Sequence, residues 1–313
     1  YPCFVQPCQP TSITVTSHDV YLSAEAWLSL TEKHRQTARH WTVPSRQRRA
    51  SRQKHPVYDF LFTYYPFSMG RLEQWHPGMG IALEVTENLP ATLCGKHYKV
   101  SKNIVKLDPL TLSLKEIQRL KWIHNLLVLT QSRVGNYGCH GMHEWAMVYS
   151  GADIRHAESA PLRLSQRETD EIVESLPITC SHFDAYRFFS PAALGLNKLR
   201  PTLRSREKNE QPACLHTNMD LYKWASKCMP WISSELLWET FLLAVRAREL
   251  DMRASPYDLR QYDYSPITIE SSDGRAEYEK LQKAISRRAR PIRQKLIHQL
   301  SNITALTSQT TDQ

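Results

Sequence analysis

The apolar spacing between residues 233 and 251 constrains the fold of this chain more than any other feature. The apolar residues recur at helical intervals, and they are Leu236, Leu237, Phe241, Leu242 and Val245. Such spacing places them on one face of a helix. Ser233 can cap the first turn, Glu235 lies within that turn, and Pro256 follows the end. The segment therefore predicts an amphipathic helix that packs on a helical core.

Helical patterns recur along the chain and predict a mainly α fold. The first helix is expected in SAEAWLSLTEKHRQTARHW, with Ser23 as its cap. Further helices are expected at about residues 114–132, 140–150, 168–175, 181–190, 217–228 and 274–300. Between Ile81 and Leu107, two short alternating runs indicate a small hairpin or sheet. We therefore expect a single helical globular domain with a small β-sheet and an extended N-terminal segment.

The two ends of the chain differ in composition from its body. Residues 1–22 have the composition of a poorly ordered extension, residues 23–300 of one mostly helical domain, and residues 301–313 of a polar tail. No run reaches the roughly 18 apolar residues that a membrane helix needs, and the N-terminal residues lack the layout of a secretory signal. We therefore expect a cytoplasmic protein that does not contact a membrane.

Missing motifs exclude several common classes of enzyme. Gly is scarce at 10 residues, and neither G-x-x-x-x-G-K-[ST] nor G-x-G-x-x-G occurs, which excludes the usual phosphate-binding loops. The G-x-S-x-G turn of many hydrolases is also missing. The 7 Cys are scattered without a C-x-x-C pair, which argues against a disulfide framework and against a Cys-rich zinc site.

The net charge of +9 is concentrated in two segments. Residues 35–54 hold seven Lys or Arg and no acidic residue, and residues 275–298 hold eight Lys or Arg against two Glu. Such segments can neutralise the phosphates of DNA. They are equally typical of solvated helix faces. DNA is therefore a candidate partner through these two segments, and the sequence does not indicate the oligomeric state.

Four stretches combine ionisable side chains with large aromatic ones, a composition typical of a pocket wall. They are GCHGMHEWAMVY at 138–149, CSHFDAYRFF at 180–189, CLHTNMDLYKW at 214–224 and ELDMRASPYDL at 249–259. In the first three, a His precedes a carboxylate by one to four residues. As a helix, the first stretch would align His140, His143 and Glu144 along one edge. The third stretch would place His216 and Asp220 on one face.

One hypothesis is a metal site assembled from three helices. Imidazole and carboxylate groups bind iron, manganese and zinc, and helical bundles present such ligands inward. The candidate ligands are His143, Glu144, His182, Asp184, His216 and Asp220. Their spacing matches neither H-E-x-x-H nor the E-x-x-H step of di-iron bundles, and each His could instead hydrogen-bond within a buried polar layer. On this hypothesis the protein is a helical enzyme that uses a divalent Fe, Mn or Zn ion on a small molecule.

A second hypothesis uses the same side chains and requires no cofactor. An N-glycosidic bond breaks through an oxocarbenium-like state, which a carboxylate can stabilise while aromatic side chains hold the base. The candidate catalytic residues are Glu144, Asp184, Asp220, His143, His182 and His216. The candidate substrate-binding residues are Trp145, Tyr65, Tyr186, Arg187, Asn218, Tyr222, Asp251 and Arg253. Both hypotheses require that the carboxylates and imidazoles of the dense stretches converge on one cavity.

Long motifs in the chain resemble a known family. They are KHPVYDFLFTYY, WHPG, GCHGMHEWAMVY, CSHFDAYRFF, QPACLHTNMDLYKW and ELDMRASPYDL. From about residue 40 to residue 290, these motifs resemble a bacterial family commonly labelled 3-methyladenine DNA glycosylase. The resemblance implies a DNA-repair hydrolase that cleaves the N-glycosidic bond of alkylated purines. The chain lacks the L-P-G-[IV]-G-like hairpin of the helix-hairpin-helix glycosylases, so the resemblance assigns no catalytic residue. A non-catalytic nucleic-acid-binding module is a third alternative.

Overall fold

The computed structural model describes residues 19–151 and 160–308 and confirms a mainly helical fold with a small sheet. The longer helices are α1 (Ala24–Ala50), α4 (Leu114–Ser132), α9 (Leu215–Lys227), α10 (Ser234–Arg253) and α11 (Ser272–Ser308). The shorter helices are α2 (Tyr58–Tyr64), α3 (Met69–Leu72), α5 (Met142–Val148), α6 (Gln166–Ser175), α7 (Phe183–Tyr186) and α8 (Arg206–Asn209). Within these two ranges, no helix combines the length and the apolar character needed to cross a membrane.

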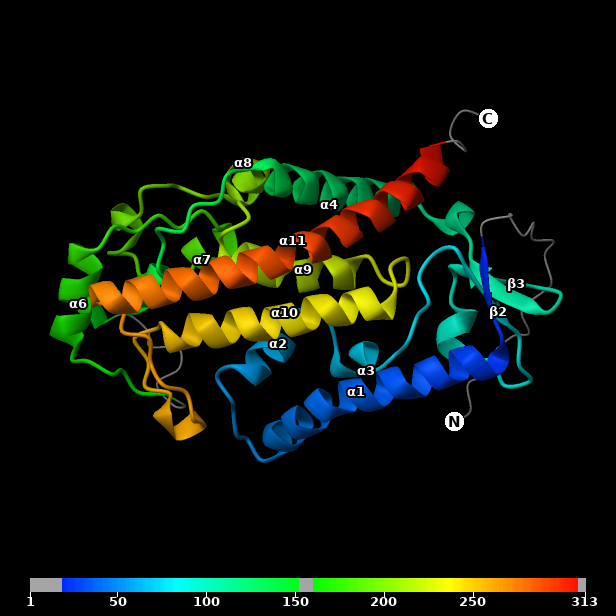
Figure 1. Ribbon diagram of the computed structural model, residues 1–313, viewed down its shortest axis with the longest axis horizontal. Coiled ribbons are helices and arrows are strands. Elements are labelled where there is room, and N and C mark those ends of the chain that lie inside the picture. The colour runs from blue at the N-terminus through cyan, green and yellow to red at the C-terminus, as the bar shows by residue number, and fades with distance from the viewer. Residues whose placement is uncertain (1–18, 152–159, 309–313) are drawn as a thin grey trace.

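The sheet lies at one end of the molecule, beside the start of α1 (Figure 1). Its strands in the described chain are β1 (Val20–Leu22), β2 (Ile81–Glu84), β3 (Tyr98–Ser101) and β4 (Ile104–Leu107), in the order β1-β2-β4-β3. β1 is parallel to β2, and the other neighbouring strands are antiparallel. The small sheet expected between Ile81 and Leu107 is therefore present, and β1 adds an edge strand to it.

The structure extends the expected domain at both ends. Val20–Leu22, expected in a poorly ordered extension, form β1 because their backbone pairs with β2 and Leu22 packs against the core. The first part of the expected polar tail, residues 301–308, continues α11. Leu300 and Ile303 are fully buried and carry the apolar face of this helix onward. Residues 1–18 and 309–313 lie outside the described residues.

Helix starts follow the local capping signals of the sequence. The hydroxyls of Ser23 and Ser233 accept hydrogen bonds from the backbone N–H groups of the first turns of α1 and α10. Ser113 and Ser165 begin α4 and α6 with capping boxes. The α1 helix is longer than the expected stretch, because it continues through Pro44 to Ala50.

Two expected helices are shorter in the structure. Gly141 has a φ of 75° and His140 a φ of 44°, so the chain enters α5 from a left-handed turn. His140 therefore lies outside the helix, and its expected alignment with His143 and Glu144 is wrong. The α7 helix covers only Phe183–Tyr186, because the backbone at His182 is extended.

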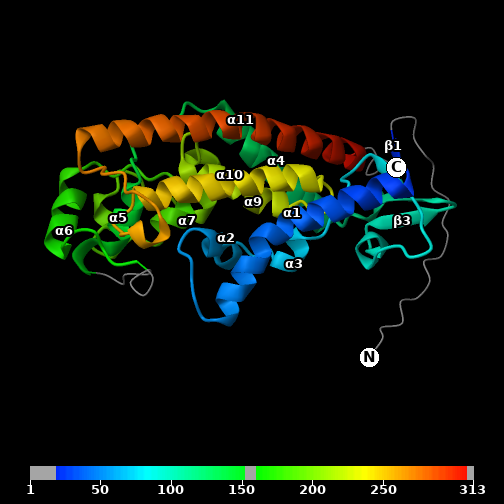
Figure 2. The ribbon, with the colours of Figure 1, turned by 60° about the horizontal axis from the view of Figure 1, so that its bottom comes forward.

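α10 lies at the centre of the helical layers, with α9 and α11 packed along it. α1 lies on the other side of α10 from α11 in both views (Figures 1 and 2). Trp41 of α1 meets Phe241 of α10 at a ring-centroid distance of 5.5 Å. α9 and α10 also carry charged side chains into this core, and among these Asp220, Arg248 and Asp251 are almost fully buried. Buried charges are costly unless they are paired, so their partners locate the candidate site.

Candidate functional site

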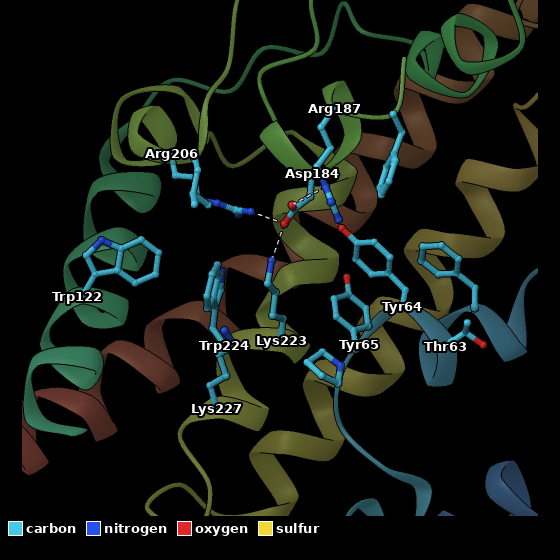
Figure 3. Close-up of a pocket in the computed structure, with 14 residues that line it drawn as sticks. Thr63, Tyr64, Tyr65, Trp122, Asp184, Arg187, Arg206, Lys223, Trp224 and Lys227 are labelled. Atoms are coloured by element: carbon cyan, nitrogen blue, oxygen red, sulfur yellow. Dashed lines mark hydrogen bonds and ion pairs between the residues drawn. The ribbon is translucent and has the colours of Figure 1, made fainter. Parts of the chain in front are cut away.

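A pocket of about 600 Å³ lies between α2, α4, α7, α8 and α9, in the size range of small-molecule sites (Figure 3). Its aromatic lining is Phe60, Tyr64, Tyr65, Trp122, Phe188 and Trp224. Its cationic lining is Arg187, Arg206, Lys223 and Lys227. Asp184 supplies a carboxylate between these groups. The pocket therefore offers flat apolar walls, a cationic rim and one acidic side chain.

Three cations hold Asp184 in place (Figure 3). Lys223 Nζ lies 2.7 Å from Asp184 Oδ2, and Arg206 donates to the same oxygen. Arg187 Nε lies 3.1 Å from Asp184 Oδ1. Burial acts to raise the pKa of Asp184, but Lys223 and Arg206 outweigh it and lower that pKa. The Asp184 carboxylate is therefore ionised at neutral pH.

A buried ion-pair network continues inward from Asp184. Asp220 Oδ2 accepts from Lys223 Nζ at 3.1 Å and lies 3.2 Å from the Nε2 atom of His182. Glu210 Oε1 accepts from Arg206 at 2.9 Å. His182, Glu210 and Asp220 form one of two groups whose ligand-type atoms lie within 4.8 Å of one another in the described chain.

The second such group joins three helices. His143 of α5, His216 of α9 and Asp251 of α10 bring their ligand-type atoms within 4.8 Å of one another. The rings of His143 and His216 are 4.4 Å apart, centroid to centroid. Burial and the neighbouring His143 lower the pKa of His216 to about 3, so its imidazole is neutral at physiological pH. His216 is also 5.5 Å from the His182 ring, so the two groups are neighbours.

Arg248 connects the second group to Glu144. Its guanidinium donates to Glu144 Oε1 at 2.7 Å and to Asp251 Oδ2 at 3.0 Å. Glu144, His216 and Arg248 also line a cavity of about 60 Å³. This cavity shares Phe60, Tyr64, Asp184 and Phe188 with the 600 Å³ pocket. The second group therefore lies directly behind the pocket wall.

The expected convergence of five side chains is partly correct. Glu144, Asp184 and His216 line the 60 Å³ cavity, whereas His182 and Asp220 lie in the adjoining ion-pair network. The six expected metal ligands do not form one cluster. His143 and His216 lie with Asp251, and His182 and Asp220 lie with Glu210. Glu144 pairs with Arg248, and Asp184 pairs with Arg206 and Lys223.

Two of the eight expected substrate-binding residues, Tyr65 and Arg187, line the 600 Å³ pocket. Three others lie in the core and do not line this pocket. Trp145 is fully buried and donates from Nε1 to the Ala254 carbonyl at 2.8 Å. Tyr222 is fully buried against Phe241, with ring centroids 5.4 Å apart. Asn218 is fully buried and accepts from Arg293 at 2.6 Å.

The remaining expected substrate-binding residues also lie outside the 600 Å³ pocket. Tyr186 donates from its hydroxyl to the Leu194 carbonyl at 3.3 Å. Arg253 lines a separate groove between α10 and α11 and donates to the Ser265 carbonyl at 2.9 Å. Asp251 belongs to the His143 and His216 group. Of these three residues, only Asp251 belongs to a candidate metal-binding group.

Four residues that organise the site were not among the candidates from the sequence: Arg206, Glu210, Lys223 and Arg248. Arg206 and Glu210 are four apart, and Asp220 and Lys223, like Arg248 and Asp251, are three apart. Opposite charges at these spacings were a usable signal. The signal was stronger for Arg248, because a charged pair interrupts the otherwise apolar face of α10.

The two basic segments lie in α1 with the turn that follows it and in α11, and neither contributes a residue to the pocket lining. Several of their cations are already paired. Arg48 lies 2.7 Å from Asp59, and Lys295 lies 2.6 Å from Glu239. Arg293 is fully buried. The cations that line the 600 Å³ pocket are therefore Arg187, Arg206, Lys223 and Lys227, which lie outside the basic segments.

Comparisons of the chain with protein-family models, curated proteins and solved structures find no match. The chemistry of the pocket therefore carries the functional inference.

Proposed function

We propose that the 600 Å³ pocket binds one nucleotide unit of DNA and that the protein hydrolyses the N-glycosidic bond of an alkylated purine there. The observation that carries this proposal is an ionised carboxylate, Asp184, between aromatic walls and a cationic rim. The resemblance of the sequence motifs to proteins labelled 3-methyladenine DNA glycosylase supports the same reaction.

The aromatic walls suit an extruded base. A base taken out of the duplex loses its stacking partners, and each aromatic side chain that replaces them contributes about 1–3 kcal/mol. Trp122 and Trp224 meet edge to face at 5.3 Å on one side of the pocket, and Tyr64 and Tyr65 lie on the other (Figure 3). An alkylated purine is cationic, so these rings also attract its charge.

The cationic rim suits the phosphates on either side of that base. The Arg187 side chain is 45% exposed, and its guanidinium lies 4.2 Å from the centre of the Phe188 ring. Lys227 is exposed, and its ammonium lies 5.6 Å from the centre of the Trp224 ring. Arg and Lys at the mouth of a pocket bind phosphate and position the strand without reading the base.

The proposed reaction needs only water besides the DNA. The bond from C1′ to the base nitrogen breaks, and its electron pair leaves with the cationic base, which becomes neutral. The Asp184 carboxylate stabilises the positive charge left on the sugar. The oxygen of a water molecule then bonds to C1′ and releases a proton to the solvent. Since the base leaves as a neutral molecule, no side chain has to protonate it.

The test is the release of free base from methylated duplex DNA by the full chain. We expect the wild-type protein to release the base. We expect the rate of release to be at least about 100-fold lower in Asp184→Asn, as when a charge-stabilising group is removed from other active sites. Asp258→Asn is the matched control, since Asp258 pairs with Arg260 outside the pocket. Circular dichroism verifies that each variant is folded. A wild-type protein that releases no base, or a folded Asp184→Asn variant with the wild-type rate, contradicts the proposal.

The second candidate function is a metal-dependent helical enzyme acting on a small molecule, with Fe, Mn or Zn. One observation favours it: the His143, His216 and Asp251 group lies directly behind the pocket wall. The two candidates differ in their response to a chelator. If the protein is a metal-dependent enzyme, a chelator abolishes its activity. If it is the glycosylase proposed above, base release at Asp184 continues in the presence of the chelator.

A further inference from the structure

His143 and Asp251 form a buried ion pair. His143 Nε2 lies 2.8 Å from Asp251 Oδ1, and neither atom has another hydrogen-bond partner among the described residues. Their side chains are 4% and 0% exposed. Imidazole nitrogen and carboxylate oxygen are also metal ligands, and these two buried atoms have only each other as polar partners.

His216 adds a third ligand-type group beside this pair. Its ring stands edge-on to the His143 ring, with the ring centroids 4.4 Å apart. The three side chains come from α5, α9 and α10, so three separate helices direct them to one point. Helical bundles build metal sites in this way.

The surroundings match those of a ligand set. Arg248 donates to Asp251 Oδ2, which leaves Oδ1 available and fixes the orientation of the carboxylate. Glu144 and Asp251 together carry one more negative charge than Arg248 supplies, and all three are buried. A divalent ion with a bound hydroxide would balance this charge at the three converging ligand atoms.

We propose that His143, His216 and Asp251 bind one divalent transition-metal ion, zinc or ferrous iron. Two imidazoles and one carboxylate, with further positions open, are the ligand set of catalytic zinc and of non-haem iron(II). Both histidines also line a cavity of about 20 Å³, which has room for one water as a fourth ligand. The site stands independently of the reaction proposed for Asp184, which requires no metal.

The neighbouring group of His182, Glu210 and Asp220 is a contrasting case. Its carboxylate oxygens are already hydrogen-bonded, Asp220 Oδ2 to Lys223 and Glu210 Oε1 to Arg206. A metal ion there would have to displace two cations that already neutralise the carboxylates. The proposal therefore covers only the His143, His216 and Asp251 group.

Elemental analysis of the purified full chain tests the site directly. The protein is incubated with Zn²⁺, or with Fe²⁺ without oxygen, and then dialysed. We expect about one ion per chain in the wild type and at least tenfold less in His216→Asn and in Asp251→Asn. His140→Asn is the matched control, because this partly buried His lies three residues from His143 and outside the group. Equal metal content in wild type and His216→Asn overturns the proposal.

A spectroscopic titration of the wild type avoids variants that fail to fold. Co²⁺ replaces zinc or iron in such sites, and its visible absorption bands report coordination by nitrogen and oxygen. We expect bands that saturate at one equivalent of Co²⁺ and disappear when Zn²⁺ is added. A wild-type protein that retains no Zn²⁺ or Fe²⁺ and develops no Co²⁺ bands contradicts the site. Neither result depends on base release, so failure of the metal site and failure of the glycosylase proposal are distinguishable.

Discussion

At the residue scale, the buried charges are balanced by particular partners, and Arg248 is the clearest example. It is 1% exposed and donates to both Glu144 and Asp251. Arg248→Met keeps most of the volume but leaves two buried carboxylates without a cation, so we expect a loss of about 3–5 kcal/mol in the free energy of unfolding. Denaturation in urea measures it. Arg246→Met, at an exposed position of the same helix, should cost less than about 0.5 kcal/mol. Similar losses in the two variants would contradict this account of the charge balance.

A substitution of Trp145 distinguishes a structural role of this residue from the expected substrate-binding role. Its ring is fully buried, and its N–H satisfies the Ala254 carbonyl. Trp145→Phe leaves that carbonyl unpaired and opens space in the core, so we expect it to lower the free energy of unfolding by about 2–3 kcal/mol. Base release by the folded variant should stay at the wild-type rate. A variant of wild-type stability that has lost base release would restore the substrate-binding role.

The sequence located the chemically dense stretches because they mix ionisable and aromatic residues within a few positions. It did not predict which side chains meet. His216 and Asp220 share a face of α9, but four helical residues complete more than one turn and leave the two side chains about 40° apart around the axis. That offset directs His216 to Asp251 and Asp220 to His182. The partners come from distant segments, so local spacing could not reveal them.

At the element scale, caps were predictable and the end of α11 was not. A Ser cap acts within one turn, so the starts of α1 and α10 are visible in the sequence. The last two turns of α11 contain Ser, Asn and Thr, which are weak helix formers, and their stability comes from packing.

Two substitutions in α11 test this packing. Ile303 is 1% exposed and Leu306 is 44% exposed. We expect Ile303→Ala to lower the free energy of unfolding by about 2–4 kcal/mol because it leaves a cavity, and Leu306→Ala to lower it by less than about 1 kcal/mol. Thermal and urea unfolding measure both losses. Equal small losses would show that the helix does not pack on the core beyond Leu300.

His76 links the sheet to the start of α10 and makes this junction sensitive to pH. Its backbone N–H donates to Ser234 Oγ at 2.8 Å, and its ring Nδ1 lies 2.9 Å from the Tyr98 hydroxyl. Burial, with smaller contributions from Arg71 and His34, lowers the pKa of His76 to about 4. Between pH 6.5 and 4 the unfolded chain therefore binds a proton that the folded chain does not, and stability falls as the pH falls.

The size of this loss of stability follows from the shift of the His76 pKa. We expect the stability advantage of the wild type over His76→Gln to shrink by up to about 3 kcal/mol between pH 7 and pH 4. Urea denaturation at a series of pH values measures this difference, and the variant removes the contribution of other titrating groups. A difference between the two proteins that stays constant over this range would contradict the assignment.

At the scale of the whole molecule, the fold class followed from periodicity and composition, but the pocket did not. Its walls come from α2, α4, α7, α8 and α9, which are separated by up to about 150 residues of chain. Charge density along the sequence also pointed elsewhere, to α1 and α11. Some of those cations are instead paired with acidic side chains of other elements, as Arg48 is with Asp59 and Lys295 is with Glu239, which only the three-dimensional arrangement reveals.

The salt dependence of DNA binding distinguishes the pocket rim from the basic helices. Each phosphate contact contributes about 0.9 to the slope of log affinity against log salt. We expect Arg187→Ala combined with Lys227→Ala to reduce that slope by about 2. Arg287→Ala combined with Arg290→Ala, at exposed positions of α11, should leave it unchanged. The opposite pattern would place the DNA on α11.

The central claim, that Asp184 stabilises a positively charged sugar in this pocket, is tested most directly by affinity for a charge mimic. Two DNA duplexes are compared, one with a cationic pyrrolidine in place of a nucleotide and one with a neutral tetrahydrofuran. A site that stabilises the transition state binds the cationic mimic more tightly. We predict at least about tenfold tighter binding of the pyrrolidine duplex, about 1.4 kcal/mol, and loss of this preference in Asp184→Asn. Equal affinity of the wild type for the two duplexes would contradict the account.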